Sequence, residues 1–171
     1  ALVGEENGGW RLAMAAASFE RGTYFIPRQV RFAQEIKALK TLAAETPNEV
    51  GGSALDCPHL RRDMARLSVD SHVLKLKTFR ALTNALRGGP PGPEGSSTKL
   101  HWSESHQKLL SMATEILGER AFSGPEPDSR DKASAGWVRD FLWTRAETIL
   151  AGTSEVQRNI LAEQLLGLPK G

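Results

Sequence analysis

The chain has 171 residues, enough for one large domain or two small ones, and its 40% apolar and 25% charged residues are typical of a globular protein. These proportions exclude a disordered, a collagen-like and a disulfide-scaffold protein. The net charge of +2, from 22 basic and 20 acidic residues spread along the chain, gives no support to nucleic-acid binding.

The first predicted element is a long helix from about Asn7 to Ala44. Apolar and small side chains recur there in alternating steps of three and four residues, which places them on one face of a helix. Pro27 lacks an amide proton and crowds the preceding turn, so we expect a kink rather than a straight rod. The predicted stripe consists of Leu12, Ala16, Phe19, Thr23, Ile26, Val30 and Ala33.

A second predicted helix follows a loop over 46–57 that is rich in Pro, Asn, Gly and Ser. Asp56 is placed to cap this helix, Pro58 to open it, and Gly88 and Gly89 to end it. Its predicted apolar stripe consists of Leu60, Met64, Leu67, Ser71, Leu74, Thr78, Ala81 and Ala85.

The third predicted helix begins at Ser96 or Ser97, after a Pro-rich stretch, and ends at Gly118. A fourth follows another loop and carries an apolar face before it stops near 151–152. That face consists of Trp137, Phe141, Leu142, Arg145 and Ile149.

The last predicted helix is short, begins at Thr153 or Ser154, buries Val156 and Ile160, and ends at Gly167. No segment competes as a strand. We therefore predict an all-α fold, an up-down helical bundle of three long and two shorter helices.

The four histidines show no metal-site pattern. His101 and His106 lie five residues apart, about 140° around a helix axis, so they cannot share an ion without a ligand from elsewhere. Paired Glu-x-x-His motifs, which would indicate a carboxylate metal bundle, are also missing. We predict no metal site and interpret the histidines as surface residues. Cys57, the only cysteine, permits no internal disulfide, which fits a reducing compartment.

Glu20 is the first candidate for chemistry. It follows the uncharged segment 12–19, and Ala16 and Ala17 lie one turn before it, which leaves a groove beside the carboxylate. Partial desolvation there would raise the pKa of Glu20 and make it a better general base. The alternative, which the spacing alone favours, is a solvated glutamate beside Arg21.

The segment 152–158 is the second candidate. Gly152 permits close approach, and a helix that opens at Thr153 or Ser154 offers free backbone N–H groups to phosphates, carbonyls or flavin oxygens. Ser154 with Gln157 equally forms an ordinary capping box that needs no ligand, and the pattern alone favours plain capping.

The stretch from Ile149 to Pro169, ILAGTSEVQRNILAEQLLGLP, resembles the closing signature of the acyl-CoA dehydrogenases. Two more stretches are similar to bacterial members that degrade lipids and sterols: 3–22, with VGEENGGW and SFERG, and 92–102, GPEGSSTKLHW. The resemblance covers nearly all of residues 1–171 but only the C-terminal helical domain of the family. Since the chain also lacks an initiator Met, we expect a fragment without the N-terminal helical and middle β domains.

The resemblance implies α,β-desaturation of an acyl-CoA thioester, in which a carboxylate removes the α-proton and the β-hydrogen passes as hydride to FAD. An electron-transfer flavoprotein would then accept the electrons. Glu20 matches the base of one subgroup, and Arg21 beside it orders that base and binds substrate. Gly152 would line the thioester pocket, while Thr153 and Glu155 match positions that contact FAD.

Three departures from the family pattern keep another interpretation open. Many relatives carry the base directly before Gly-Thr, where this chain has Ala151. An Arg-x-Phe-Gly segment that binds FAD across subunits is missing, and Glu119 replaces a glycine where the ADP of FAD would approach. The alternative is a non-catalytic helical assembly subunit of a hetero-oligomeric acyl-CoA dehydrogenase. A homo- or hetero-tetramer is the expected assembly.

No apolar stretch approaches the ~18–20 residues that cross a bilayer, so we expect no membrane span and a cytoplasmic location. The isolated domain is expected to be inactive, because the other domains would supply much of the flavin and CoA surface.

Overall fold

Helices make up most of the described part of the chain, which in this computed structural model comprises residues 2–89, 92–123 and 132–170, with 17–23, 123 and 132–135 described by their backbone alone. No helix in these ranges is long and apolar enough to cross a membrane. The elements are α1 (Gly9–Thr23), α2 (Phe25–Glu45), the 3-10 turn η1 (Ala54–Asp56), α3 (Pro58–Leu86), α4 (Glu94–Leu117), α5 (Arg120–Ser123), α6 (Lys132–Glu147), α7 (Ser154–Ile160) and the π turn η2 (Leu161–Leu165).

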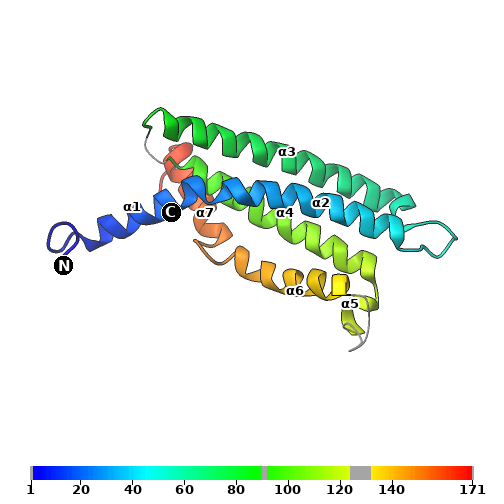
Figure 1. The fold of residues 1–171 in the computed structure, drawn as a ribbon. Coiled ribbons are helices and arrows are strands. Elements are labelled where there is room, and N and C mark those ends of the chain that lie inside the picture. Colours follow the sequence, from blue (N-terminus) through cyan, green and yellow to red (C-terminus); the bar gives the residue numbers. More distant parts are fainter. Residues whose placement is uncertain (1, 90–91, 124–131, 171) are drawn as a thin grey trace.

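The three long helices α2, α3 and α4 run side by side in alternating directions, and α6 returns along α4 (Figure 1). Helix α4 contacts α2, α3, α6 and α7, so it forms the centre of the bundle. Within the described ranges the backbone forms only an isolated bridge between Pro47 and Ser53 and no strand. The predicted all-α up-down bundle is confirmed, with α5 as an additional short helix.

The first predicted helix is in fact two helices, α1 and α2, which meet at Tyr24. Pro27 is the third residue of α2, where a missing N–H costs little because the first N–H groups of a helix have no acceptor within it. The predicted stripe is wrong for α2, where Val30 is exposed and Ile26 and Ala33 are only half-buried. In α1, Ala16 is exposed, and the side chains of Phe19 and Thr23 lie outside the described residues. The buried residues are instead Phe25, Gln29, Phe32, Ile36, Leu39 and Ala43.

Helix α3 follows its predicted stripe from Leu60 to Thr78. The predicted cap is wrong. Asp56 belongs to η1, where its Oδ2 accepts hydrogen bonds from the backbone N and the Oγ of Ser53 at 2.8 and 3.1 Å. Cys57 takes the N-cap position of α3, followed by Pro58, because Asp56 already closes the preceding turn.

Helix α4 begins at Glu94, two residues before the predicted serine caps, and Ser96 is buried inside it. Gly118 ends it at φ +56°, a left-handed conformation that glycine adopts without strain. Helix α4 is buried on more than one face, since other helices surround it. Its buried apolar residues, which form the middle of the core, are Trp102, Leu109, Leu110, Met112, Ala113, Ile116 and Leu117.

The last two helices depart most from the predicted burial. Helix α6 ends at Glu147, and Leu142 is exposed. Helix α7 begins at Ser154 as predicted, but it buries Ser154 and Gln157 instead of Val156, because α7 packs its polar face onto α4.

Candidate functional site

The turn between α6 and α7 holds two residues in left-handed conformations, Ala151 at φ +55° and Gly152 at φ +92°. A side chain at Gly152 would meet the Gln157 amide nitrogen inside van der Waals contact. For Ala151, a non-glycine residue, this conformation is strained, so surrounding contacts must hold it.

Two buried side chains hydrogen-bond to the backbone carbonyls of this turn. The Lys99 ammonium group, on a residue only 2% exposed, donates a hydrogen bond of 2.7 Å to the Gly152 carbonyl. Gln157 Nε2 donates to the carbonyls of Ala151 and Gly152 at 2.9 and 3.3 Å. Both carbonyls therefore point into the protein, and a charged hydrogen bond of this kind is stronger than a neutral one.

The expected capping box of Ser154 with Gln157 does not form. Thr153 is the N-cap of α7, and its Oγ1 accepts a hydrogen bond from the Val156 backbone N at 3.3 Å. Ser154 Oγ and Gln157 Oε1 are buried and have no hydrogen-bond partner within the described part of the chain. Buried polar atoms without a partner are uncommon and mark this turn as a place where another group is expected.

Glu155 is exposed at the start of α7. Hydrogen bonds from its own backbone N–H and from the Thr153 side chain lower the pKa of Glu155, so the carboxylate is charged at neutral pH and can only accept hydrogen bonds. Gly152, Thr153 and Glu155, all singled out in the sequence, lie together on this turn.

Glu20 and Arg21 lie near the end of α1, but their side chains fall outside the residues that the structure describes. Their backbone positions place them one helical turn before Tyr24. Helices α1 and α7 both contact α4 and lie at the end of the bundle where α4 begins (Figure 1).

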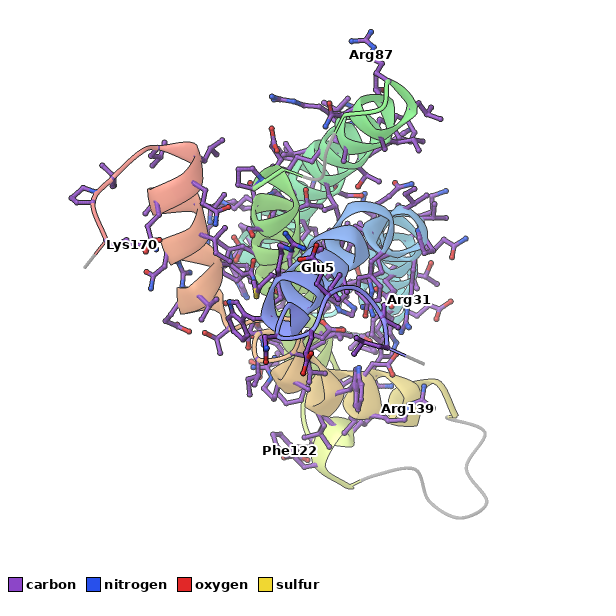
Figure 2. The ribbon with its side chains drawn as sticks, turned by 90° about the vertical axis from the view of Figure 1, so that its left-hand side faces the viewer. Glu5, Arg31, Arg87, Phe122, Arg139 and Lys170 are labelled. Carbon is purple, nitrogen blue, oxygen red and sulfur yellow. The ribbon has the colours of Figure 1, made fainter. Side chains whose placement is uncertain are left out.

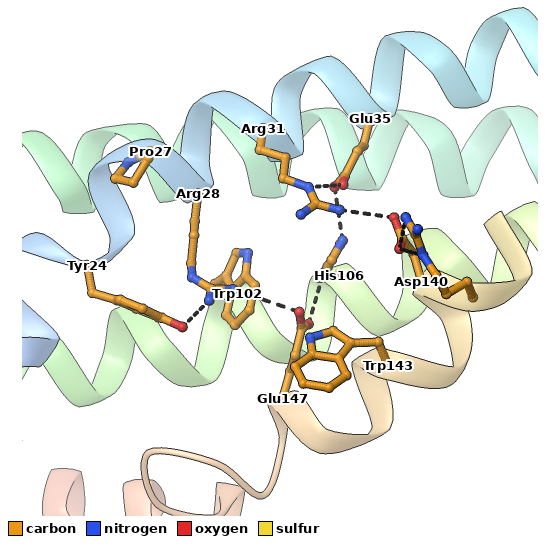
Figure 3. A pocket seen from close by; sticks show the side chains of 11 residues that line it. Tyr24, Pro27, Arg28, Arg31, Glu35, Trp102, His106, Asp140, Trp143 and Glu147 are labelled. Atoms are coloured by element: carbon orange, nitrogen blue, oxygen red, sulfur yellow. Dashed lines mark hydrogen bonds and ion pairs between the residues drawn. The ribbon is translucent and has the colours of Figure 1, made fainter. Parts of the chain in front are cut away.

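A cavity of about 730 Å³ opens between α2, α4 and α6 (Figure 3). Figure 2 shows Arg31 of α2 and Arg139 of α6, two of its lining residues, on the side of the bundle away from α7. The lining residues are Tyr24, Pro27, Arg28, Arg31, Glu35, Trp102, His106, Arg139, Asp140, Trp143 and Glu147.

His106 lies buried in the floor of this cavity between two glutamates. Its Nδ1 is 2.7 Å from Glu147 Oε2, and its Nε2 is 2.9 Å from Glu35 Oε2, an ion pair without the alignment of a regular hydrogen bond. The imidazole also stacks on Trp102, with ring centroids 5.5 Å apart. The interpretation of the histidines as surface residues is therefore wrong for His106. His101 is half-buried, with its Nε2 3.1 Å from the Asp70 carbonyl, while His59 and His72 are exposed.

Burial by itself lowers the pKa of His106, but the contacts with Glu147 and Glu35 outweigh it and raise the pKa to about 9. His106 is thus an imidazolium at neutral pH. Because both ring nitrogens face carboxylates, it has no lone pair with which to accept a proton, and we assign it a structural role rather than that of a catalytic base.

Arg28 and Arg31 are the cations that lie beside the acids and rings of the cavity floor. Arg31 Nε lies 2.6 Å from Glu35 Oε1, and its Nη2 lies 3.0 Å from Asp140 Oδ2. Burial alone would raise the pKa of Glu35, but His106 and Arg31 lower it. The Arg28 guanidinium lies between the rings of Tyr24 and Trp102, 4.0 and 4.2 Å from their centroids, and donates to the Tyr24 hydroxyl. Each carboxylate of the floor therefore has a cationic partner.

Sequence reasoning missed the cavity, because its walls come from α2, α4 and α6, and nothing in local spacing indicates that these segments meet. Among the described residues, no group of three or more His, Cys, Asp or Glu could hold a metal ion.

The comparisons with known proteins agree with one another. The family model "Acyl-CoA dehydrogenase, C-terminal domain" matches residues 7–166. The chain is 35% identical over 173 residues to acyl-CoA dehydrogenase IpdE1 of Mycobacterium tuberculosis, covering 99% of this chain and 40% of that protein. It is 27% identical to the mouse mitochondrial short-chain specific acyl-CoA dehydrogenase, covering 96% of this chain and 38% of that protein.

Solved structures show the same likeness. The ChsE4-ChsE5 complex of Mycobacterium tuberculosis matches with a TM-score of 0.77 and 25% identity, over 99% of this chain and 43% of that one. The Tcur3481-Tcur3483 steroid ACAD matches with a TM-score of 0.74 and 26% identity, over 99% and 42%. The chain spans about two fifths of the length of the relatives it matches.

Proposed function

Because the chain belongs to the acyl-CoA dehydrogenase family, whose C-terminal domain it matches over residues 7–166, we propose that it is that domain of an enzyme that desaturates an acyl-CoA thioester between its α and β carbons. Residues 1–171 would act together with an N-terminal helical and a middle β domain in one longer protein. The observation that carries this proposal is the turn before α7, where Gly152 and Thr153 match the family signature and where Lys99 and Gln157 hold the carbonyls inward.

Glu20 is the proposed catalytic base. It lies on α1, at the end of the bundle where α7 also packs on α4, and it precedes Arg21 as the base does in one subgroup of the family. A carboxylate in this place would remove the α-proton once the thioester is bound, with Arg21 and Gly152 binding the substrate. Ala151 has no proton-accepting group, so the turn itself supplies no base.

FAD is the cofactor of this family, and the polar groups at the start of α7 are of a kind that can hydrogen-bond to it. Ser154 Oγ is buried without a partner among the described residues. The anionic Glu155, to which the Thr153 hydroxyl donates, can still accept from ribose or ring N–H groups. We propose that Thr153 and Glu155 contact FAD, which when bound supplies the acceptor for the β-hydrogen. The role of this chain is to position the thioester beside it.

The remaining partners are part of the proposal. Acyl-CoA would be the substrate, an electron-transfer flavoprotein the electron acceptor, and a homo- or hetero-tetramer the assembly. A hetero-oligomeric form is supported by the relative described as a ChsE4-ChsE5 complex. A cytoplasmic location is part of the proposal. The isolated domain would be inactive.

A second candidate function is a non-catalytic assembly subunit whose partner chain carries out the reaction. Ala151, in place of the glutamate that many relatives carry, is the observation that favours it.

The deciding experiment replaces Glu20 with glutamine in the full-length protein, purified with its partner chain. We expect flavin bleaching on mixing with acyl-CoA to slow by about 10²–10⁴-fold, the usual contribution of a general base. Glu45→Gln, at the exposed end of α2, is the matched control and should bleach at the parent rate. Equal bleaching by the Glu20→Gln protein would reject Glu20 as the base and favour the assembly subunit.

A further inference from the structure

Lys99 places a buried positive charge beside the turn that precedes α7. It lies on α4 and is 2% exposed, and its ammonium group donates a hydrogen bond of 2.7 Å to the Gly152 carbonyl. Burying a charged group costs free energy. A neutral side chain is enough to satisfy a carbonyl of this turn, as Gln157 does for Ala151. Support of the backbone alone therefore does not account for a charge at this position.

The carbonyls of this turn point toward the interior, so the amides that follow them point the other way. Gln157 Nε2 binds the Ala151 carbonyl at 2.9 Å, and Lys99 binds the next carbonyl. In a planar trans peptide the C=O and the following N–H point in opposite directions. The N–H groups of Gly152 and Thr153 are therefore directed to the outer side of the turn. That side is open, since Ala151 is exposed.

A cation that is hydrogen-bonded to a carbonyl polarises the whole peptide group, and this makes the N–H at its far end a stronger donor. From standard bond lengths, the Thr153 amide nitrogen lies about 4–5 Å from Lys99 Nζ, with only the Gly152 peptide group between them. The charge of Lys99 also reaches Glu155. Hydrogen bonds from its own backbone N–H and from Thr153 are the main causes that lower the pKa of Glu155, and the charges of Arg158 and Lys99 lower it further.

The proposed reaction is one that such an amide can assist. When the α-proton of a thioester leaves, the electron pair is shared with the thioester oxygen, which becomes more negative than in the bound substrate. A polarised N–H directed at that oxygen therefore stabilises the transition state more than the ground state. Because the cation is buried, water screens its field only weakly. Lys99 can act in this way without touching the substrate.

We propose that Lys99 is a positioning residue of the reaction, which directs the Thr153 amide toward the thioester oxygen and polarises it through the Gly152 carbonyl. This inference rests on the proposed function for the identity of the substrate, but it does not depend on Glu20 being the base. It assigns different roles to the two buried donors, since Gln157 holds the same turn without a charge.

Three variants of the full-length protein, purified with its partner chain and FAD, separate the charge from the support of the backbone. Lys99→Met removes the charged donor, and Gln157→Met removes the neutral one. Lys108→Met, which removes an exposed lysine from the same helix, is the matched control. Flavin bleaching is followed with butanoyl-, octanoyl- or hexadecanoyl-CoA, whichever reduces the parent fastest.

We expect Lys99→Met to lower the limiting rate of bleaching by about 10–100-fold, less than the loss of a whole oxyanion donor because the N–H itself remains. The half-saturating concentration should change by no more than about 3-fold, because the interaction strengthens only in the transition state. Gln157→Met should lower the limiting rate by at least about 5-fold less than Lys99→Met does, since the charge stays in place. Lys108→Met should bleach at the parent rate.

Infrared spectroscopy gives a readout that needs no turnover. Among the 2-enoyl-CoA esters of the same three chain lengths, the one that binds the parent most tightly is labelled with carbon-13 at its thioester carbonyl. In the parent, the bound carbonyl should absorb at lower wavenumber than the free thioester. In Lys99→Met it should absorb closer to the free value, because a less polarised N–H withdraws less electron density from the carbonyl.

The inference is overturned if Lys99→Met and Gln157→Met slow bleaching equally, or if Lys99→Met changes only the half-saturating concentration. It is also overturned if the parent leaves the carbonyl at its free wavenumber, a result that needs no variant to fold. Bleaching at the parent rate by Lys99→Met would refute the role of Lys99 and leave the proposed function standing. A carbonyl shift that depends on Lys99, without bleaching by any of the three thioesters, would refute the desaturation and leave Lys99 standing. Binding of none of the three enoyl esters would refute both.

Discussion

Replacing His106 with glutamine removes the positive charge that lies between Glu35 and Glu147. In the parent protein the folded-state pKa of His106 is about 9, above its ordinary value of 6.5. Its stabilising contribution is therefore fully present below pH 6.5 and is lost as the pH rises through about 9. The glutamine variant should not show this loss.

The expected size of the effect follows from the two pKa values. Raising a pKa from 6.5 to about 9 corresponds to a change of about 3 kcal/mol in the free energy of unfolding across this pH range. We expect the parent protein to lose about that much more stability than His106→Gln between pH 6 and pH 10. Titratable groups that do not contact His106 are common to both proteins and cancel in the difference.

Urea unfolding followed by circular dichroism at several pH values measures this difference, and NMR titration of the imidazole C–H signals measures the pKa directly. His59→Gln is the matched control, since His59 is exposed and pairs with Glu115 at the surface. It should leave the pH profile of the parent unchanged. A parent and a His106→Gln protein with parallel stability profiles, or an NMR midpoint near 6.5, would show that the two glutamates do not hold a protonated histidine.

Three further substitutions test the turn and the core by urea unfolding. Lys99→Met should lower the free energy of unfolding by about 1–3 kcal/mol because it takes a charged donor from the buried Gly152 carbonyl, and a neutral result would show that Gln157 alone satisfies that carbonyl. Gly152→Ala should lower the free energy of unfolding by about 1–3 kcal/mol, because the alanine is strained at this φ and its Cβ clashes with Gln157. Gly51→Ala is the control, since Gly51 has a similar φ of +89° but open space around it, and it should lose clearly less. Equal losses in the two variants would contradict the close approach of Gly152 to Gln157. Phe32→Ala should cost about 3–5 kcal/mol because the ring is fully buried, and a loss below 1 kcal/mol would mean that Phe32 is not in the core.

Local spacing predicted the parts of the fold that depend on one helix. The stripe from Leu60 to Thr78 is buried because α3 is a regular amphipathic helix with one face on the bundle. The α2 stripe failed because two sets of residues on this helix, one with Val30 and one with Phe32, both follow helical spacing, and spacing alone does not say which of the two faces meets the bundle. Burial on several faces of α4 was also missed, since the position of α4 among the other helices is a property of the bundle.

In the candidate site, too, some residues could be identified from local sequence and others could not. Gly152, Thr153 and Glu155 could be found because they are adjacent in the sequence and start a helix. The role of Lys99, 53 residues from the carbonyl it binds, could not. His106 likewise appeared isolated, because its two partners lie on α2 and α6, and charge neutralisation between helices leaves no local signal.

The central place of α4 has a consequence for motion. Backbone amides in a helix covered by several others are released only when the whole bundle opens, so those of α4 should be the last to exchange with deuterated water. Helix α1 has few covering neighbours, with most of its described side chains exposed, and should exchange early. Helix α1 is thus expected to open before the scaffold that carries Lys99.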